Sequence, residues 1–217
     1  MNTYDYILKK YNLHRRKEYF LEIPNMGRNE LAILFNELGF EKGAEIGVER
    51  GMYSEVLCKA NSNLHLSCID PWKSVAYESY TTEGKAAQTH FDACFKEAKK
   101  RLKPYNCTII RKTSLVACAT FADNSLDFVY IDGNHDFVHV AQDLHYWLQK
   151  IRVGGIISGH DYANFPYHKF NHVKRVIDAY FHCYMMVPYF IVGEFAGQKG
   201  HIRDRFRSWF CVKRENL

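Results

Sequence analysis

The sequence predicts an α/β fold, with a doubly wound, mostly parallel sheet of seven strands, helices on both faces and an antiparallel C-terminal hairpin strand. Three observations support this prediction. Short apolar runs alternate with segments of helical periodicity from residue 43 to residue 159. A chain of 217 residues, 47% of them hydrophobic, can bury the core of one such domain. Two further apolar runs, 185–192 and 208–212, close the chain and are joined by a glycine-containing connection.

The N-terminal segment predicts two helices. Apolar residues within 3–20 recur at spacings of three and four, and Pro24 breaks this pattern. A second helix is predicted over 28–38, ending at Gly39. We therefore expect residues 1–40 to form a helical cap and residues 41–217 to form the main domain.

The central segment alternates strictly between the two element types. Strands are predicted at 43–47, 65–69, 107–111, 126–131 and 155–159, and helices at 53–60, 87–102, 115–120 and 138–150. A last helix is predicted around Val173, Val176, Ile177, Tyr180 and Phe181. This order is typical of a Rossmann-like sheet, in which ligands bind at the carboxyl ends of the strands.

Two stretches are predicted to be lids or substrate insertions, at 71–86 and 162–182. The first is longer than a simple connection requires and carries Trp72, Tyr77 and Tyr80. An alternative is a surface excursion with Trp72 packed beneath it.

Charge and cysteine content favour a cytoplasmic protein that binds neither nucleic acid nor membrane. The net charge of +5 comes from scattered short clusters, which more often solvate helix surfaces than bind nucleic acid. The seven cysteines lack C-x-x-C spacing, so we expect reduced thiols rather than a zinc cage. The first 20 residues hold no apolar signal region, and no segment approaches 18 apolar residues.

Residues 44–54 predict a nucleotide-cofactor pocket. An apolar strand runs into Gly47, a helix follows Gly51, and Asp70 ends the next strand 23 residues after Gly47, where it could bind ribose hydroxyls. Glu45 would repel a pyrophosphate but would suit S-adenosylmethionine, which carries an ammonium and a sulfonium. Packing alone could also explain this pattern, and NAD remains an alternative cofactor.

Two more strands end in polar residues at the same predicted edge. Asp132 and His135 follow the strand at 126–131, and His160 and Asp161 follow the strand at 155–159. Because the strands are parallel neighbours, these four side chains should lie on one rim.

The combined motifs resemble class I S-adenosylmethionine-dependent methyltransferases. More narrowly, they resemble the subgroup that contains macrolide sugar O-methyltransferases and cephalosporin-hydroxylase-like proteins, over residues 28–213. The residues that carry the resemblance are Glu45-Ile46-Gly47-Val48, Ile69-Asp70, Ile131-Asp132-Gly133-Asn134-His135, Gly154-Gly155 and Gly159-His160-Asp161-Tyr162.

The resemblance implies a role for each matched position in cofactor binding. Glu45 and Gly47 would line the methionine portion of the cofactor, Asp70 would accept the ribose hydroxyls, and Asp132 would lie beside the transferred methyl group. Further cofactor contacts are expected from Gly51, Ser54, Thr113 and Ser114, with Thr113 or Ser114 near the adenine.

The resemblance also implies a metal site and a catalytic base. In metal-dependent members, the aspartate that matches Asp132 and an acidic pair hold magnesium, and here the pair is His160 and Asp161. Because magnesium prefers oxygen ligands, His160 leaves room for a softer divalent cation or for none. His135 corresponds to the histidine that acts as general base in the sugar-modifying relatives, although His160 is an alternative base and His135 would then shape the turn.

These observations predict an S-adenosylmethionine-dependent O-methyltransferase that acts on a sugar or phenol-like small molecule, with a divalent metal as an open question. The alternatives are an NAD-dependent oxidoreductase and a non-catalytic cofactor-binding protein. Homo-oligomerisation is a further expectation from the resemblance.

Overall fold

The computed structural model describes residues 1–14, 18–73, 85–164, 171–194 and 199–215. The helices are α1 Thr3–Lys10, α2 Arg28–Glu37, α3 Met52–Ala60, α4 Lys85–Leu102, α5 Ser114–Cys118, α6 Phe137–Lys150 and α7 Val173–Cys183. The strands are β1 Phe20–Ile23, β2 Lys42–Ile46, β3 His65–Ile69, β4 Cys107–Ile110, β5 Leu126–Ile131, β6 Ile151–Gly159, β7 Tyr189–Val192 and β8 Ser208–Val212.

All of these strands form one sheet in the order β1-β7-β8-β6-β5-β2-β3-β4. Every pairing is parallel except those of β8, which runs antiparallel to both β6 and β7. From β2 the chain builds outward through β3 and β4, and then returns to β5 on the other side of β2. The carboxyl ends of β2 and β5 therefore form the topological switch point, where doubly wound sheets bind ligands.

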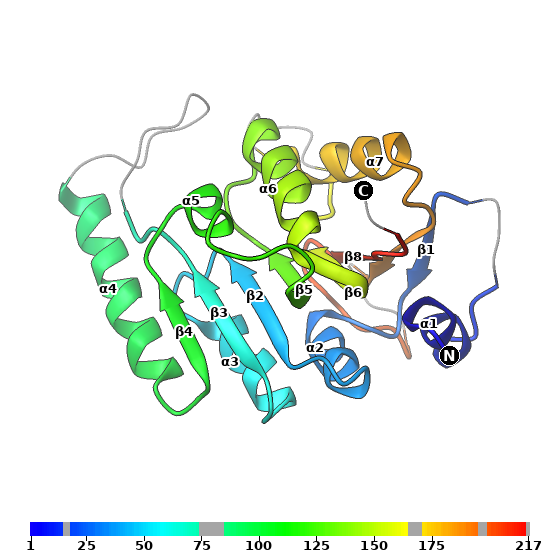
Figure 1. Cartoon of the computed structure of the whole chain (residues 1–217). Helices are drawn as coiled ribbons and strands as arrows, with labels where there is room; N and C mark the ends of the chain where they lie inside the picture. Colours follow the sequence, from blue (N-terminus) through cyan, green and yellow to red (C-terminus); the bar gives the residue numbers. More distant parts are fainter. Residues whose placement is uncertain (15–17, 74–84, 165–170, 195–198, 216–217) are drawn as a thin grey trace.

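Two helical layers cover the sheet (Figure 1). One apolar core lies between the sheet and α1 to α4, and includes Phe35, Leu57 and Phe128. A second core lies between the other face and α5 to α7, and includes Trp147 and Phe181. Because both faces are covered, the central strands are apolar on both sides, which explains their continuous hydrophobic runs.

The N-terminal segment differs from the prediction. The first helix ends at Lys10 rather than continuing to residue 20, because Asn12 takes a left-handed backbone conformation with φ of 52°. Phe20–Ile23 instead forms β1, an eighth strand that pairs in parallel with β7. Leu21 and Ile23 are buried in the core while Glu22 points outward. The alternation of apolar and polar residues was present in the sequence, but the helical spacing of the preceding residues masked it.

The remaining elements match the prediction to within a few residues, with two exceptions at strands. β7 is shorter than the predicted 185–192, and β6 begins at Ile151 rather than at residue 155. The fold class is confirmed, including the antiparallel C-terminal strand, which lies between β6 and β7.

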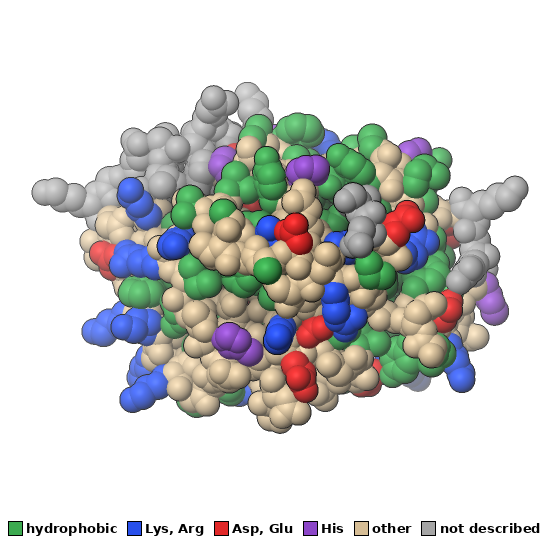
Figure 2. All heavy atoms as spheres, in the orientation of Figure 1, with side chains coloured by type: hydrophobic (Ala, Val, Ile, Leu, Met, Phe, Trp, Pro, Cys, Tyr) green, Lys and Arg blue, Asp and Glu red, His purple; other side chains and the backbone are tan. Residues whose placement is uncertain are grey.

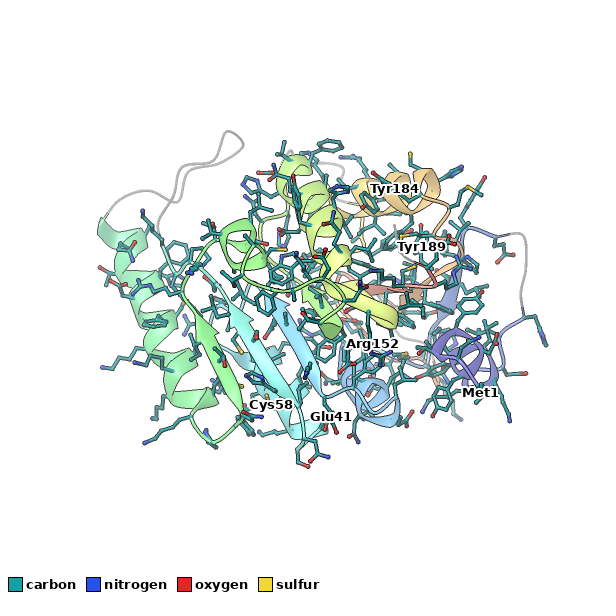
Figure 3. The ribbon with its side chains drawn as sticks, in the orientation of Figure 1. Met1, Glu41, Cys58, Arg152, Tyr184 and Tyr189 are labelled. Atoms are coloured by element: carbon teal, nitrogen blue, oxygen red, sulfur yellow. The ribbon has the colours of Figure 1, made fainter. Side chains whose placement is uncertain are left out.

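The amino end of the sheet is held by polar contacts around Asp127. Its carboxylate accepts hydrogen bonds from the backbone N–H groups of Glu41 and Lys42, and Arg152 Nε donates to it at 2.7 Å. Glu41 and Arg152 are labelled in Figure 3, at the end of the sheet away from the predicted site. This cluster therefore ties β2, β5 and β6 together structurally.

The surface carries its charge in a dispersed way. On the face shown in Figure 2, basic side chains are most crowded over α4, at the left edge, and others are interspersed with acidic ones. Among the described residues, no helix is both long and apolar enough to span a membrane.

Candidate functional site

A cavity of about 1180 Å³ opens at the carboxyl ends of the central strands. The loops after β2, β3 and β5 line it, together with the first residues of α5 and α6. Its lining contains the predicted site residues Glu45, Gly47, Asp70, Thr113, Ser114, Asp132 and His135. The sheet topology therefore brings most of the predicted cofactor residues to one place.

The loop after β2 depends on two glycines. Gly47 has φ of +89°, and a Cβ there would lie 2.1 Å from the carbonyl oxygen of Asp132. Only glycine permits both this backbone conformation and this close approach. Gly51 has φ of +71° and caps the start of α3. The loop thus crosses directly beside the end of β5, which brings the predicted cofactor loop next to Asp132.

Asp70 supports this loop through its carboxylate. Oδ2 accepts hydrogen bonds from the N–H groups of Val48 at 3.1 Å and Glu49 at 3.0 Å, and Oδ1 accepts one from the N–H group of Trp72 at 2.7 Å. The predicted contact with ribose hydroxyls would add to these three bonds, for which a carboxylate has spare acceptor sites.

Glu45, close to the carboxyl end of β2, is buried. Its carboxyl group is hydrogen-bonded to Ser54, which is also buried. Burial raises the pKa of Glu45 to about 8, although the Ser54 hydrogen bond acts in the other direction. In the ligand-free protein Glu45 is therefore largely protonated at neutral pH, whereas a nearby cation would favour its charged form.

Thr113 and Ser114 lie at the start of α5 on the cavity wall. Ser114 Oγ donates to the buried carboxylate of Asp143 and accepts a hydrogen bond from Trp147 Nε1 at 2.8 Å. Burial raises the pKa of Asp143 to about 6. Ser114 is thus already engaged with α6, whereas the Thr113 side chain makes no capping hydrogen bond.

Asp132, His135 and Asp161 form a compact group whose ligand atoms all lie within 4.8 Å of one another. His135 Nε2 lies 3.1 Å from Asp161 Oδ2 and 3.5 Å from Asp132 Oδ1, but it is buried without a partner in hydrogen-bond geometry. Burial lowers the pKa of His135, but the adjacent Asp132 and Asp161 outweigh this effect and raise it. An unpaired imidazole nitrogen between two carboxylates is a suitable donor set for a divalent cation.

Asp161 itself is held in a strained conformation. Its φ is +61°, and its neighbours on both sides are fixed by backbone bonds, from His160 N–H to Ile131 and from Tyr162 N–H to Arg207. Burial raises the pKa of Asp161, but the opposite effect of His160 and His135 is larger. The pKa of Asp161 is therefore below its usual value. A left-handed aspartate held by its surroundings is typical of a functional position.

His160, which was predicted to join Asp132 and Asp161 at a metal, lies outside this group of ligand atoms. Its Nε2 lies 3.3 Å from Asp204 Oδ1, and its Nδ1 lies 3.6 Å from Asp161 Oδ2. Burial lowers its pKa, but these carboxylates outweigh burial and raise it to about 9. His160 is therefore largely protonated at neutral pH and lies beside the carboxylate of Asp161. A protonated imidazole cannot accept a proton as a base.

Arg28 is a cavity residue that the sequence did not single out. It is the first residue of α2, and its backbone is fixed because Asp204 accepts its N–H and its carbonyl accepts the hydroxyl of Tyr53. The guanidinium lies over the Tyr53 ring at 5.5 Å and lines the cavity that contains Asp132. Burial lowers the pKa of Arg28, but Tyr130 and nearby carboxylates outweigh it and raise that pKa. Nothing in the local sequence marks Arg28, because its neighbours come from distant segments.

The two predicted lids are only partly visible. Tyr77 and Tyr80 lie outside the described residues, as do residues 165–170. Trp72 is fully buried, donates Nε1–H to the carbonyl oxygen of Glu49, and packs against the ring of Phe95 on α4. Tyr162 is also buried, and its hydroxyl donates to Asp178 at 2.6 Å, next to Tyr189 (Figure 3). The described aromatic residues of these segments therefore serve packing.

Comparison with known proteins shows the family of the chain. The methyltransferase-domain family matches residues 44–162, which is more than half of the chain. The protein therefore belongs to this family of class I S-adenosylmethionine-dependent methyltransferases. Among curated proteins, none matches the chain significantly.

Several solved structures share the fold at low sequence identity. The O-methyltransferase TomG from Streptomyces achromogenes, solved with S-adenosylmethionine, has a TM-score of 0.60 at 15% identity, over 96% of this chain and 86% of TomG. An O-methyltransferase from Bacillus cereus, solved with S-adenosylhomocysteine, has a TM-score of 0.58 at 16% identity, over 97% and 90%. A structure described as a caffeoyl-CoA O-methyltransferase from Staphylococcus aureus has a TM-score of 0.57 at 12% identity, over 96% and 90%.

Proposed function

We propose that this protein transfers the methyl group of S-adenosylmethionine to a hydroxyl group of a small molecule. The observation that supports this most is that the predicted cofactor loop and the end of β5 line the same cavity. The glycine loop that would bind the cofactor lies against the end of β5, where Asp132 and His135 begin the acceptor side. A cofactor methyl and an acceptor oxygen bound on these two sides would be brought together, and such positioning is a main source of catalysis in methyl transfer.

The cofactor side is proposed to use the predicted residues and one addition. Glu45, Gly47 and Asp70 would bind the methionine and ribose portions, with Thr113 or Ser114 near the adenine. Gly51 and Ser54 do not line the cavity and would act indirectly, Gly51 at the start of α3 and Ser54 through its hydrogen bond to Glu45. We add Arg28, whose guanidinium lines the cavity above the Tyr53 ring, to bind the carboxylate of the cofactor's amino-acid portion.

The acceptor side is proposed to remove a proton. The acceptor oxygen forms a bond to the methyl carbon while the carbon–sulfur bond breaks, and S-adenosylhomocysteine leaves. His135 Nε2 faces Asp132 and Asp161 and would keep its proton there, so Nδ1 accepts the hydroxyl proton. Asp161, supported from behind by His160, would hold the imidazole in place.

The same group fits a divalent cation. Asp132, Asp161 and His135 Nε2 would hold it, since their ligand atoms cluster and the nitrogen lacks a hydrogen bond. In that alternative Nε2 carries no proton, and His135 acts as a ligand instead of as the base. When bound, such a cation would lower the pKa of the acceptor hydroxyl. The mixed oxygen and nitrogen donor set suits manganese or a later divalent metal better than magnesium.

A sugar or a phenol is the proposed acceptor class. The resemblance of the motifs points to sugar O-methyltransferases, whereas the structures with the same fold are described as O-methyltransferases, one of tomaymycin synthesis and one of caffeoyl-CoA. Both groups of relatives modify hydroxyls of small molecules, so the test includes both classes.

The first experiment is calorimetric titration with S-adenosylhomocysteine, in manganese, in magnesium and in EDTA, with NADH as the control ligand. We expect micromolar binding of S-adenosylhomocysteine and none of NADH. Methyl transfer from labelled S-adenosylmethionine is then measured to a panel of phenols, catechols and hexoses. Absence of binding in every condition would contradict the cofactor assignment, and transfer only to amines or thiols would contradict O-methylation.

The role of His135 is tested by His135→Ala. Turnover with an acceptor from the panel should fall by about 10²- to 10⁴-fold, the usual contribution of a general base. Affinity for S-adenosylhomocysteine should stay within about twofold, because the proposed base does not bind the cofactor. His145→Ala is the matched control, since His145 is exposed on α6 outside the cavity. Unchanged turnover in His135→Ala would exclude His135 as the base.

A further inference from the structure

A second group of metal-type ligands lies beside the cavity, apart from Asp132, His135 and Asp161. It consists of Glu49, on the loop after β2, and His90 and Cys94, on α4. One ligand atom from each residue lies within 4.8 Å of the other two. His90 and Cys94 are four residues apart, so they lie on the same face of the helix.

The two helical ligands are hydrogen-bonded to each other at a separation that a tetrahedral cation could also span. His90 Nε2 lies 3.5 Å from Cys94 Sγ. A tetrahedral zinc ion with ordinary bond lengths separates a thiolate sulfur from an imidazole nitrogen by about 3.6 Å. Cys94 is fully buried, whereas His90 and Glu49 are exposed, so the thiol forms the inner wall and the open side faces solvent.

The position of Glu49 is imposed by the loop. Its φ is +48°, a conformation that costs a glutamate free energy and needs support from the surroundings. Its N–H donates to Asp70 at 3.0 Å, and its carbonyl accepts the indole N–H of Trp72 at 2.7 Å. The backbone bonds of Glu49 thus hold the residue where its carboxylate can meet α4.

The chemistry of the donors separates this group from the first. One sulfur, one nitrogen and one carboxylate oxygen favour zinc and other thiophilic cations, whereas the group at Asp132 offers no sulfur. Three protein ligands also leave a fourth tetrahedral position for water.

We propose that Glu49, His90 and Cys94 bind a thiophilic divalent cation of the zinc type, which ties the loop after β2 to α4 at the rim of the cavity. Glu49, together with its neighbours Val48 and Arg50, lines the cavity. A bound cation would therefore restrain the loop that is proposed to hold the cofactor. With zinc bound, the affinity for S-adenosylhomocysteine should rise about fivefold or more. Fivefold is the lower end of the usual change in affinity when two binding sites are coupled.

Cobalt(II) is the probe that distinguishes the two groups, because only a thiolate ligand gives an intense near-ultraviolet sulfur-to-cobalt absorption. We expect this band to reach its maximum at one equivalent in the full-length protein. It should persist in His135→Ala and in Cys107→Ser, the second being a control for the pair of thiols Cys58 and Cys107, whose sulfurs lie 3.4 Å apart. It should disappear in Cys94→Ser.

Zinc affinity, measured by competition with a chromophoric chelator, gives a second readout. Cys94→Ser and His90→Ala should each weaken zinc binding by more than about 100-fold, beyond the loss caused by an outer-shell partner. His90 is exposed, so His90→Ala keeps the test valid even if Cys94→Ser fails to fold. The absence of a sulfur–cobalt band in the unmodified protein, or its persistence in Cys94→Ser, would overturn the site. Zinc binding without a change in S-adenosylhomocysteine affinity would overturn the coupling to the loop.

Discussion

At the scale of single residues, Glu45 shows how burial creates a group whose charge depends on its ligand. The cavity-lining carboxyl group has lost its water and keeps its proton up to a pKa of about 8. A cationic cofactor would remove that proton, so binding and ionisation are coupled at this position. Such a carboxyl group also affects the stability of the ligand-free protein.

Glu45→Gln should therefore change how stability depends on pH. In the unfolded chain Glu45 ionises near its ordinary value, whereas in the folded protein its pKa is raised to about 8. Stability is lost as pH rises between these values, because the unfolded state releases the proton first. The loss is on the order of 3 kcal/mol between pH 5 and pH 8. Urea unfolding at several pH values should show this slope in the native protein and a flatter one in Glu45→Gln.

The control for this measurement is Glu22→Gln, since Glu22 is an exposed carboxylate on β1. The free energy of unfolding of Glu22→Gln should depend on pH in the same way as that of the native protein. If Glu45→Gln kept the native slope, the carboxyl group of Glu45 would not be responsible for the loss.

Arg28→Met tests the proposed contact with the cofactor carboxylate. S-adenosylhomocysteine should bind about 10- to 150-fold more weakly, because a hydrogen bond to a charged group contributes about 1.5–3 kcal/mol. Methylthioadenosine, which lacks the amino-acid portion, should bind equally well to both proteins. Calorimetry with the two ligands measures the difference directly.

Arg50→Met is the matched control for Arg28→Met, since Arg50 also lines the cavity but already pairs with Glu97 at 2.8 Å. Arg50→Met should change the affinity for S-adenosylhomocysteine and for methylthioadenosine by no more than about twofold, because an exposed ion pair contributes little free energy. Equal losses for both ligands in Arg28→Met would mean that Arg28 shapes the cavity. No loss for either would assign Arg28 to the acceptor side.

At the scale of elements, the loop after β2 explains why two strands that are far apart in sequence can share one site. Gly47 allows the loop to pass beside the end of β5, and Asp70 at the end of β3 holds the loop from the other side. Three parallel neighbours thus place their polar residues at one edge. Parallel pairing with its fixed register is what converts their separate sequence motifs into one site.

The strand β1 is the element that sequence analysis missed, and its contribution can be measured. Ile23 is 1% exposed in the core between the sheet and α1 to α4, so Ile23→Ala should lower the free energy of unfolding by about 2–5 kcal/mol. Glu22→Ala on the outer face of the same strand should cost less than about 1 kcal/mol. Chemical denaturation of both variants checks this, and a small effect for both would place β1 outside the cooperative core.

At the scale of the whole molecule, ligand binding should report on the fold and the proposed cofactor together. At a concentration of 100 times its Kd, S-adenosylhomocysteine stabilises a single-site protein by about 2.7 kcal/mol. For a chain of this size the melting temperature should rise by about 5–10 °C. NADH should produce no shift, because the loop lacks the glycine pattern for a pyrophosphate and carries Glu45. A shift with NADH alone would reverse the cofactor assignment.

The sequence by itself determined the fold class, the order of the central elements and the cluster of polar residues at the carboxyl edge. Apolar periodicity is a local property, and it is readable because apolar strands and helices alternate in order from residue 42 to residue 159. Glu45, Gly47, Asp70 and Asp132 could be predicted as candidates because each lies at or just beyond the carboxyl end of such a strand. Parallel pairing then requires these residues to be neighbours.

Only the tertiary structure decided which of the two histidines joins Asp132 and Asp161, and that Arg28 enters the cavity. Both outcomes depend on residues far away in sequence. His160 Nε2 lies 3.3 Å from Asp204 Oδ1, in the segment before β8, whereas His135 Nε2 lies 3.1 Å from Asp161 Oδ2. The same Asp204 accepts the backbone N–H of Arg28 and fixes the start of α2. Contacts of this range leave no periodic trace in the sequence, because they depend on how the layers pack around the sheet.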